Sequence, residues 1–436
     1  MYQKWLDLGL SKGITDLEIY AVHNRSLKLS VYQNKLDQHV QSAVESVTIR
    51  GIYQNKLSTV RFENLSDENV SKMLDQLIEN AKALTVVEPA IIYEGSKDYP
   101  VVKDELFDFK TVPVIEKINL LKTLEHEILA CPEVSQVQTT MYQEVESKTA
   151  IVNSKGLNLS RQQSYAYAYA VGVFKRGETD IQTAYDIKLA KKFSDFDPKH
   201  MAKTTIDMGV AKLGGKSIPT GSYPVIFSNE MFSDMLGVFS SIFSGEQAFR
   251  NMTPLKTKVN EKIFDEKINL VNDPMHSDAF FKPTFDDEGV ASKKRHVIKD
   301  GIFTGFNHNL KTAKIFNTEP TGNSFSSSIQ MANFVLEPGK RSFDDIIKGI
   351  SSGVLITDLI GLHAGVKTVS GEFSLQAAGQ KIENGKIAYP VKMIVLSGNF
   401  FDMMNHVVEI GSDLKFSLSG VASPSVHIES LMIGGE

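Results

Sequence analysis

Phe285-Asp286-Asp287-Glu288-Gly289-Val290 opens the stretch around which we organise the chain. It continues as Lys293-Lys294-Arg295, then as Val297-Ile298-Lys299-Asp300-Gly301-Ile302-Phe303, and ends on His308-Asn309. An acidic turn, a basic run and an Asp-Gly hairpin are more polar than a core strand requires. We therefore expect another molecule to contact the chain here. The alternative is an ordinary solvated hairpin with charged flanks.

The chain has 436 residues, which is too many for one hydrophobic core. We expect two domains, with the border in the Gly- and Pro-bearing segment around residue 217: an N-terminal α+β domain over 1–216 and a C-terminal β-rich domain over 217–436. Apolar residues make up 42% and charged residues 23% of the chain, so most of it should fold.

Charge and cysteine content exclude several classes of protein. The net charge is -5, whereas a protein held by nucleic-acid phosphates needs clustered Lys and Arg, so we expect no direct nucleic-acid binding. The only cysteine, Cys131, excludes an internal disulfide framework and a Cys-rich metal site, which suits a reducing cytoplasm. We find no signal peptide or membrane-spanning stretch, because Asp7 interrupts the start and Thr357 and Asp358 interrupt the longest apolar run.

Hydrophobic periodicity predicts the elements of the first domain. Period-two alternation indicates two antiparallel sets of strands, separated by helices with one apolar face. The expected strands cover 17–22, 26–32, 36–46, 47–53 and 57–62, then 137–148, 150–153, 162–174 and 182–187. The expected helices cover 2–12, 66–84, 114–130 and 197–212, with Ser66 and Asp197-Pro198 as start signals.

The sequence predicts mostly strands and turns in the second domain. Ser228 is expected to cap a helix that runs to Phe243, and a second helix is expected over 341–350. Asp300-Gly301 and Asn384-Gly385 are hairpin signals. The fold class is therefore α+β with two domains: an N-terminal antiparallel sheet layered with helices, and a C-terminal β-rich domain of sandwich or barrel type.

Several short stretches resemble catalytic or phosphate-binding motifs, but each one lies in the wrong structural context for that role. His126-Glu127 has Ala130 where a second ligand would stand, and Pro132 ends that helix. Gly214-Gly215-Lys216-Ser217 follows a helix where a phosphate loop follows a strand, so a linker is the better reading. Gly-x-Ser-x-Gly occurs at 9–13 and 349–353, but both copies close predicted helices instead of opening them.

The acidic turn could in principle hold a hard cation. An oxygen cage needs alternating acids over a longer loop, however, so we expect Asp286, Asp287 and Glu288 to be neutralised by Lys293 to Arg295.

Several short motifs of the second half accompany the opening stretch. They are Thr321-Gly322-Asn323, Ile382-Glu383-Asn384-Gly385-Lys386, Pro390-Val391, Ser397-Gly398-Asn399, Asp402, Ile410-Gly411 and Asp413. With these motifs the chain resembles the TldD/PmbA family over its whole length. The family is associated with two-subunit metalloproteases that trim and degrade peptides, and it was earlier described as a modulator of DNA gyrase.

The resemblance also implies which branch of the family this chain is similar to. The catalytic branch carries His-Glu-x-x-x-His on the helix that opens the second domain, and a Cys ligand near the C-terminus. With Gly245 as anchor, those positions fall on Leu236, Gly237 and Ser241, and no Cys follows Cys131. We therefore expect no metal and no catalytic residue in this chain, with zinc in a catalytic partner, as in the PmbA (TldE) branch.

Three hypotheses for function follow. The first is the non-metal subunit of a heterodimeric peptidase, paired with a TldD-like catalytic subunit or with itself, that holds unfolded peptide as an added strand. The second is an independent hydrolase that uses Asp286, Asp287, Glu288 and His308, and the third is a protein-binding regulator of the gyrase-modulator type. The candidate peptide-groove or partner contacts are Asp286, Asp287, Glu288, Gly289, His308, Asn309, Thr321, Gly322 and Asn323.

Overall fold

A computed structural model describes residues 1–63, 66–85, 88–102 and 109–436. The contacts divide the chain into two compact units. The first is Met1–Gly95 with Val101–Leu213, and the second is Ser96–Pro100 with Gly214–Glu436. The sequence placed the border three residues later and gave no sign that the short segment 96–100 belongs with the second half.

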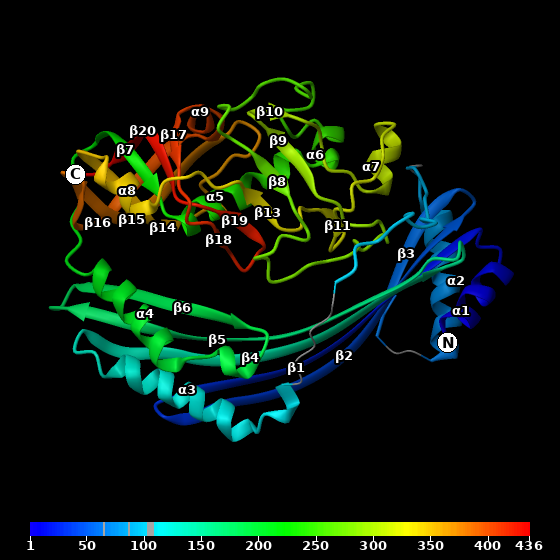
Figure 1. The fold of residues 1–436 in the computed structure, drawn as a ribbon. Coiled ribbons are helices and arrows are strands. Elements are labelled where there is room, and N and C mark those ends of the chain that lie inside the picture. Colours follow the sequence, from blue (N-terminus) through cyan, green and yellow to red (C-terminus); the bar gives the residue numbers. More distant parts are fainter. Residues whose placement is uncertain (64–65, 86–87, 103–108) are drawn as a thin grey trace. The chain divides into compact units, whose positions relative to one another are not determined.

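The first unit is built on one antiparallel sheet of six strands, in the order β3-β2-β1-β4-β5-β6, which bends into a half-barrel (Figure 1). Hairpins join neighbouring strands except β1 and β4, and Gln54 and Asn55, both with positive φ angles, form the turn between β2 and β3. The strands are β1 Asp16–Tyr32, β2 Lys35–Tyr53, β3 Lys56–Phe62, β4 Val134–Asn153, β5 Asn158–Arg176 and β6 Asp180–Ala190.

Several predicted strands are parts of longer ones. The expected breaks at 23–25, between 46 and 47, and at 149 do not exist, because β1 pairs with β2 and with β4 across all of them. His23, Asn24 and Arg25 are exposed, so the apolar alternation stops there. Main-chain pairing continues, since ladder hydrogen bonds do not depend on side-chain polarity. The sequence pattern therefore underestimated strand length.

The predicted helices of the first unit are confirmed to within a residue or two. Ser66 caps α2 by accepting from Asn69 N, and the Asp197 carboxylate caps α4, which has Pro198 in its first turn. One core packs α1 and α2 on the sheet, and a second packs α3 and α4 on it. The helices are α1 Tyr2–Ser11, α2 Asp67–Ala83, α3 Val114–Leu129 and α4 Pro198–Lys212, with 3-10 turns η1 Phe109–Thr111 and η2 Phe193–Asp195.

The second unit contains a closed five-stranded barrel. Its strands follow the order β16-β15-β14-β7-β20, and pairing of β16 with β20 closes the ring. Closure leaves no open edge among these strands. They are β7 Gly221–Phe227, β14 Ser352–Ile360, β15 Glu372–Glu383, β16 Lys386–Asn399 and β20 Val426–Gly434, and β17 Val407–Ile410 is added to β20.

A second sheet of short strands lies in the same unit, in the order β10-β9-β8-β13-β19-β18. Its members are β8 Leu270–Asn272, β9 Arg295–Lys299, β10 Ile302–Phe303, β13 Phe334–Leu336, β18 Lys415–Phe416 and β19 Val421–Ser423, and a separate hairpin joins β11 Ser324–Phe325 to β12 Ser328–Ile329. Positive φ angles confirm the predicted turns at Asp300-Gly301 and Asn384-Gly385.

The second unit has more helix than the sequence indicated. The expected helix 228–243 is α5 Asn229–Phe239, which continues as the 3-10 turn η3 Ser240–Phe243, and the expected helix 341–350 is α8 Phe343–Lys348. The additional helices are too short for a 3.6-residue period to show in the sequence. They are α6 Gly245–Phe249, α7 Leu310–Ile315 and α9 Phe400–Asn405.

Within the described ranges, the helices are either too short or too polar to cross a bilayer.

Candidate functional site

The acidic turn Phe285–Val290 is a compact loop of the second unit. It is closed by a bridge between Phe285 and Ala291 and by hydrogen bonds from Asp286 N to Val290 O and from Gly289 N to Asp286 O, each 3.0 Å. Gly289 adopts φ of +81°, a conformation in which glycine is favoured. The turn is therefore a fixed element of the fold.

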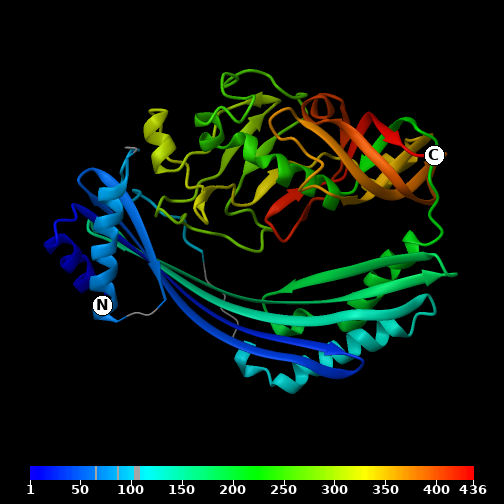
Figure 2. The ribbon, with the colours of Figure 1, turned by 180° about the vertical axis from the view of Figure 1, so that it is seen from behind.

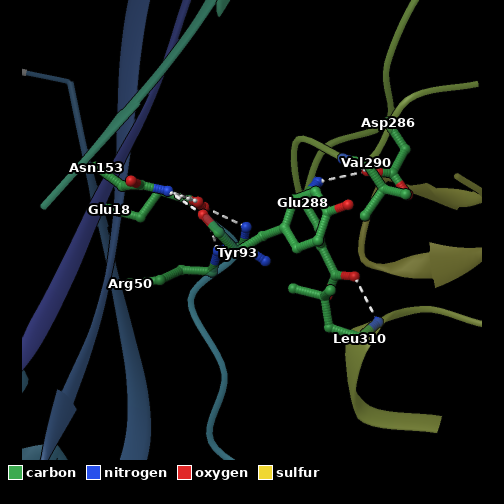
Figure 3. A network of polar contacts seen from close by, with 8 residues as sticks. All are labelled: Glu18, Arg50, Tyr93, Asn153, Asp286, Glu288, Val290 and Leu310. Carbon is green, nitrogen blue, oxygen red and sulfur yellow. Dashed lines mark hydrogen bonds and ion pairs between the residues drawn. The ribbon is translucent and has the colours of Figure 1, made fainter. Parts of the chain in front are cut away.

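The Asp286 carboxylate is fully buried and organises this loop. Its Oδ1 accepts hydrogen bonds from the main-chain N–H of Glu288 and of Val290, at 3.0 and 2.9 Å (Figure 3). Its Oδ2 accepts one from Ser324 N at 2.9 Å. Burial, followed by the nearby Glu288 charge, raises the pKa of Asp286 to about 7, although the three N–H donors act in the opposite direction.

The two neighbouring acids connect the turn to other segments. Asp287 accepts a hydrogen bond from Ser326 N at 2.9 Å. Glu288 accepts one from Leu310 N, at the first residue of α7, at 2.8 Å (Figure 3). A carboxylate is favourable at a helix N-terminus because the first N–H groups lack partners within the helix. The acidic residues thus serve as local main-chain acceptors.

The basic run does not neutralise Asp286, contrary to expectation. Lys294 pairs with Asp273 at 2.8 Å, and the Arg295 guanidinium donates to Asn307 Oδ1 and Gly305 O at 2.8 and 2.7 Å. Only Arg295 of this run lies in β9, and Lys294 and Arg295 are held by partners in different segments, so the run does not converge on the acidic turn.

His308 and Asn309 lie directly beside the turn. His308 is 6% exposed, its Nδ1 lies 3.1 Å from Thr312 Oγ1, and burial followed by the charge of Arg295 lowers its pKa to about 4. Asn309 caps α7 by accepting from Thr312 N. His308 is therefore a neutral imidazole packed at the start of a helix.

The predicted trio Thr321, Gly322 and Asn323 completes the same cluster. The main chains of Thr321 and His308 are joined by Thr321 N to His308 O at 3.0 Å, and Thr321 Oγ1 accepts from His308 N at 2.8 Å. Gly322 has φ of +72°, and a Cβ there would stand 2.5 Å from Ala291 O. The structure thus brings together all the residues that the sequence selected.

Buried amides continue the cluster inward. Asn323 Nδ2 donates to Gln330 O at 2.9 Å and to Asn272 Oδ1 at 3.3 Å, and Asn272 Oδ1 also accepts from Ala332 N. Asn323 Oδ1 and the Ser292 hydroxyl have no hydrogen-bond partner among the described atoms. Sequence reasoning missed Asn272, because a single Asn on a short strand carries no pattern.

Segment 96–100 is the part of the site that the sequence did not reveal. Ala291 N donates to Ser96 Oγ at 2.9 Å, and Tyr99 hydrogen-bonds to Gly289 O at 2.8 Å. The Tyr99 ring also meets Phe285 edge to face, with centroids 6.5 Å apart. A short segment from before α3 is therefore bound along the acidic turn.

The preceding segment is anchored within the first unit. Asn153 Nδ2 donates to Tyr93 O at 2.7 Å and to Glu18 Oε2 at 3.2 Å, and Arg50 forms an ion pair with the buried Glu18 (Figure 3). The segment before residues 94–95 is thus held by hydrogen bonds to the first unit, and the segment after them is held by hydrogen bonds to the second unit.

The three positions at which the resemblance would set the zinc motif offer no imidazole, thiolate or carboxylate. Leu236 is buried in the core of the second unit, Gly237 has no side chain, and Ser241 supplies one hydroxyl. Zinc in proteins is held by imidazole, thiolate or carboxylate donors, so these residues do not fit a zinc ion. Over the described part of the chain, no three His, Cys, Asp or Glu residues are grouped so that they could hold a metal.

The arrangement gives no support to the independent hydrolase. A catalytic base must present an acceptor atom to substrate, but the Asp286 carboxylate is fully buried and accepts hydrogen bonds from three main-chain N–H groups. The Nδ1 of His308 faces Thr312, and its neighbour Asn309 is engaged in capping. The cluster supports a surface and does not assemble a nucleophile with a base.

Fold and site together describe an α+β protein of two compact units, with a half-barrel sheet in the first unit and a closed five-stranded barrel in the second. Three family models match, and the chain belongs to the PmbA/TldD family. The models are described as PmbA/TldA metallopeptidase domain 1, central domain and C-terminal domain, and they match residues 17–81, 107–213 and 220–435.

Individual relatives agree with this assignment. The chain is 26% identical to the metalloprotease PmbA homolog of Buchnera aphidicola, covering 98% of this chain and 95% of the relative. It is 23% identical to the metalloprotease PmbA of Escherichia coli O157:H7, covering 98% and 94%.

Solved structures share the fold over the full length. A Thermotoga maritima protein described as a candidate modulator of a DNA gyrase has a TM-score of 0.92 and 30% identity, over 99% of both chains. TldE from Thermococcus kodakarensis has a TM-score of 0.87 and 24% identity, over 100% of both chains.

Proposed function

We propose that this chain is the subunit without metal of a two-subunit metallopeptidase, and that it helps to hold unfolded peptide for cleavage or maturation by a zinc-bearing, TldD-like partner. The observation that supports the proposal is the set of residues at the motif positions: in the register anchored at Gly245, the resemblance sets Leu236, Gly237 and Ser241 where a metal-binding chain of the family would have its ligands and base. Activation of a water molecule for peptide hydrolysis would then fall to the partner.

Family membership supports the reaction class. The Buchnera and Escherichia coli relatives are named as metalloproteases. A role as a modulator of DNA gyrase rests on the descriptions of solved structures such as the Thermotoga protein, and the acidic net charge of this chain does not favour binding to DNA.

The cluster around the acidic turn is the proposed contact surface for peptide or partner. Asp287, Glu288, Asn309 and Thr321 keep partly exposed side chains and can make the contacts. The remaining members, Asp286, Gly289, His308, Gly322 and Asn323, are buried and hold that surface in shape. A preformed surface binds with less loss of conformational entropy than a flexible one.

The test uses the purified chain and a purified family member that carries His-Glu-x-x-x-His. We expect the two to co-elute, and the mixture to cleave an unstructured peptide faster than the partner alone. If the partner alone is equally active and the two chains elute separately, the proposal fails.

A paired substitution locates the surface. Thr321→Ala and Glu288→Gln should reduce cleavage by the mixture, while Thr220→Ala, at an exposed position of the same unit, should leave it unchanged. Metal analysis of the untagged chain should find no stoichiometric zinc. One equivalent of zinc bound to this chain would instead make it a catalytic subunit.

A further inference from the structure

The helix-covered face of the first-unit sheet has a gap between its two pairs of helices. α1 and α2 pack against alternate residues of β1 from Leu17 to Ala21, and α3 and α4 pack against alternate residues from Leu27 to Val31. Because alternate side chains of a strand point to the same face, His23 and Arg25 lie on this face too, and both are exposed. The two pairs of helices lie toward opposite ends of the sheet in both views (Figures 1 and 2).

A cavity of about 690 Å³ lies in this gap, beside the start of α3. Strands β2, β1, β4 and β5 form its floor, on which Ala43, Arg25, Glu146 and Ser164 lie opposite one another in a row. Its described lining residues all belong to the first unit. The volume falls in the range of small-molecule sites. The wall consists of Phe109, Lys110, Val112, Val114 and Lys117.

The cavity presents groups of both charges. Lys117 is buried and donates to Glu144 Oε2 at 2.6 Å, and Lys110 donates to Glu146 Oε2 at 2.7 Å. Over the described part of the chain, no residue hydrogen-bonds to the Oε1 atom of either glutamate, and no residue pairs with the Arg25 guanidinium. Two carboxylate oxygens and one cation can therefore take a ligand.

We propose that this cavity binds a short peptide with both termini free. The α-carboxylate of the peptide would pair with Arg25, and its α-ammonium group would pair with the Oε1 atom of Glu144 or Glu146. Such charge-assisted hydrogen bonds are stronger than neutral ones. An apolar side chain of the peptide would lie against Leu27 and Phe109, which also line the cavity.

A ligand with a single charge fits this lining less well. An anion would stand close to Glu144 and Glu146, and a cation would stand close to Arg25 and the two lysines. Burial of a charged group is costly unless that group is paired. A zwitterion satisfies both kinds of group at once.

The spacing of the charged groups sets the length of the peptide. Glu144 lies opposite Leu27, so Arg25 and Glu144 are diagonal neighbours on adjacent strands. Diagonal neighbours are about 7–8 Å apart. An extended chain advances about 3.5 Å per residue, so a dipeptide or a tripeptide bridges this separation.

This site is distinct from the contact surface of the proposed function. The acidic turn lies in the second unit and is proposed to meet unfolded peptide, whereas the cavity lies in the first unit and suits the short products of proteolysis. Binding in the cavity requires this chain alone, so it is measured without a catalytic partner.

Isothermal titration calorimetry of the full-length chain with the tripeptide Ala-Leu-Ala tests the proposal. We expect saturable binding of one peptide per chain. N-acetylation and C-amidation of the peptide should each weaken binding at least about tenfold, because each removes one charge that a buried pair requires. An absence of binding, or equal binding of the peptide with both ends blocked, would overturn the proposal.

Variants of the chain locate the site. Arg25→Gln should weaken binding of Ala-Leu-Ala at least about tenfold, but it should not change the weaker binding of the amidated peptide, which has no carboxylate for Arg25. Ala43→Phe should abolish binding by filling the cavity. The matched control is Arg176→Gln, at the exposed end of β5, which should bind as the parent chain does. Parental affinity in both Arg25→Gln and Ala43→Phe would place the peptide elsewhere and contradict the proposal.

Discussion

The hydroxyl group of Tyr99 lies 2.8 Å from the main-chain carbonyl oxygen of Gly289, to which it donates a hydrogen bond across 190 residues of sequence. The same hydroxyl accepts a hydrogen bond from Ser96 N at 2.9 Å. One oxygen atom therefore joins a short segment from the first half of the chain to the acidic turn of the second unit, and it shapes both.

Tyr99→Phe should loosen this segment. The change removes two hydrogen bonds but keeps the ring against Phe285, so we expect a loss of about 1–2 kcal/mol in the stability of the second unit. Hydrogen exchange at 96–100 and at 289–291 should accelerate. The control is Tyr185→Phe, because the Tyr185 side chain is 55% exposed. Equal exchange rates in the two variants would show that the hydroxyl contributes nothing.

Asp286→Asn should destabilise the second unit by about 1–3 kcal/mol at neutral pH. The Asp286 carboxylate offers two acceptor oxygens to three main-chain N–H groups, whereas an Asn amide has only one oxygen. The NH2 group of that amide would face one of these N–H donors. Chemical denaturation measures the loss. The prediction is wrong if the variant is as stable as the parent chain, and Asp278→Asn, at an exposed aspartate of the same unit, provides the baseline.

Asp286→Asn should also change how the stability of the second unit depends on pH. The pKa of Asp286 is raised from 3.8 to about 7 in the folded state, so the folded chain holds that proton more tightly than the unfolded chain does. Its contribution to stability is then fully present below about pH 4 and is lost as pH rises to about 7. A stability profile from pH 4 to 7 should decline less in Asp286→Asn than in the parent, and identical slopes would contradict this.

His308 should affect the pH dependence of stability in the opposite direction to Asp286, and His308→Gln should remove that effect. The pKa of His308 is lowered from 6.5 to about 4, so the unfolded chain takes up this proton first as the solution is acidified. The contribution of His308 is therefore present above about pH 6.5 and is lost as pH falls toward 4. The variant should lose less stability over this window than the parent does. His363→Gln, at an exposed histidine, should show the parental slope.

Gly322→Ala should be among the most damaging small changes to the site. It combines φ of +72° with a new Cβ at 2.5 Å from Ala291 O, which is main chain and cannot rotate away. Gly177→Ala separates the two effects, because Gly177 has φ of +67° and nothing within 4 Å of its added Cβ. We expect about 1 kcal/mol for the control and a clearly larger loss for Gly322→Ala in thermal unfolding. Equal losses would mean that the contact with Ala291 relaxes freely.

Local sequence determined much of the fold. Apolar periodicity and capping residues such as Ser66 and Asp197 specify the four long helices, because these signals lie within a single turn of helix. Asp300-Gly301 and Asn384-Gly385 specify their hairpins because few other dipeptides tolerate two successive positive φ angles. Side-chain chemistry alone likewise indicates that the residues at 236, 237 and 241 are not zinc ligands.

Tertiary structure decided how the candidate residues meet and how long the strands are. Asp286, His308 and Asn323 are separate in sequence, and hydrogen bonds from the main-chain N–H groups of Ser324 and His308 to the side chains of Asp286 and Thr321 bring their segments together. β1 runs through its polar stretch at 23–25 because both neighbouring strands pair with it there. The attachment of Tyr99 to Gly289 depends on a main-chain carbonyl, which every residue has, and only folding places that carbonyl within reach.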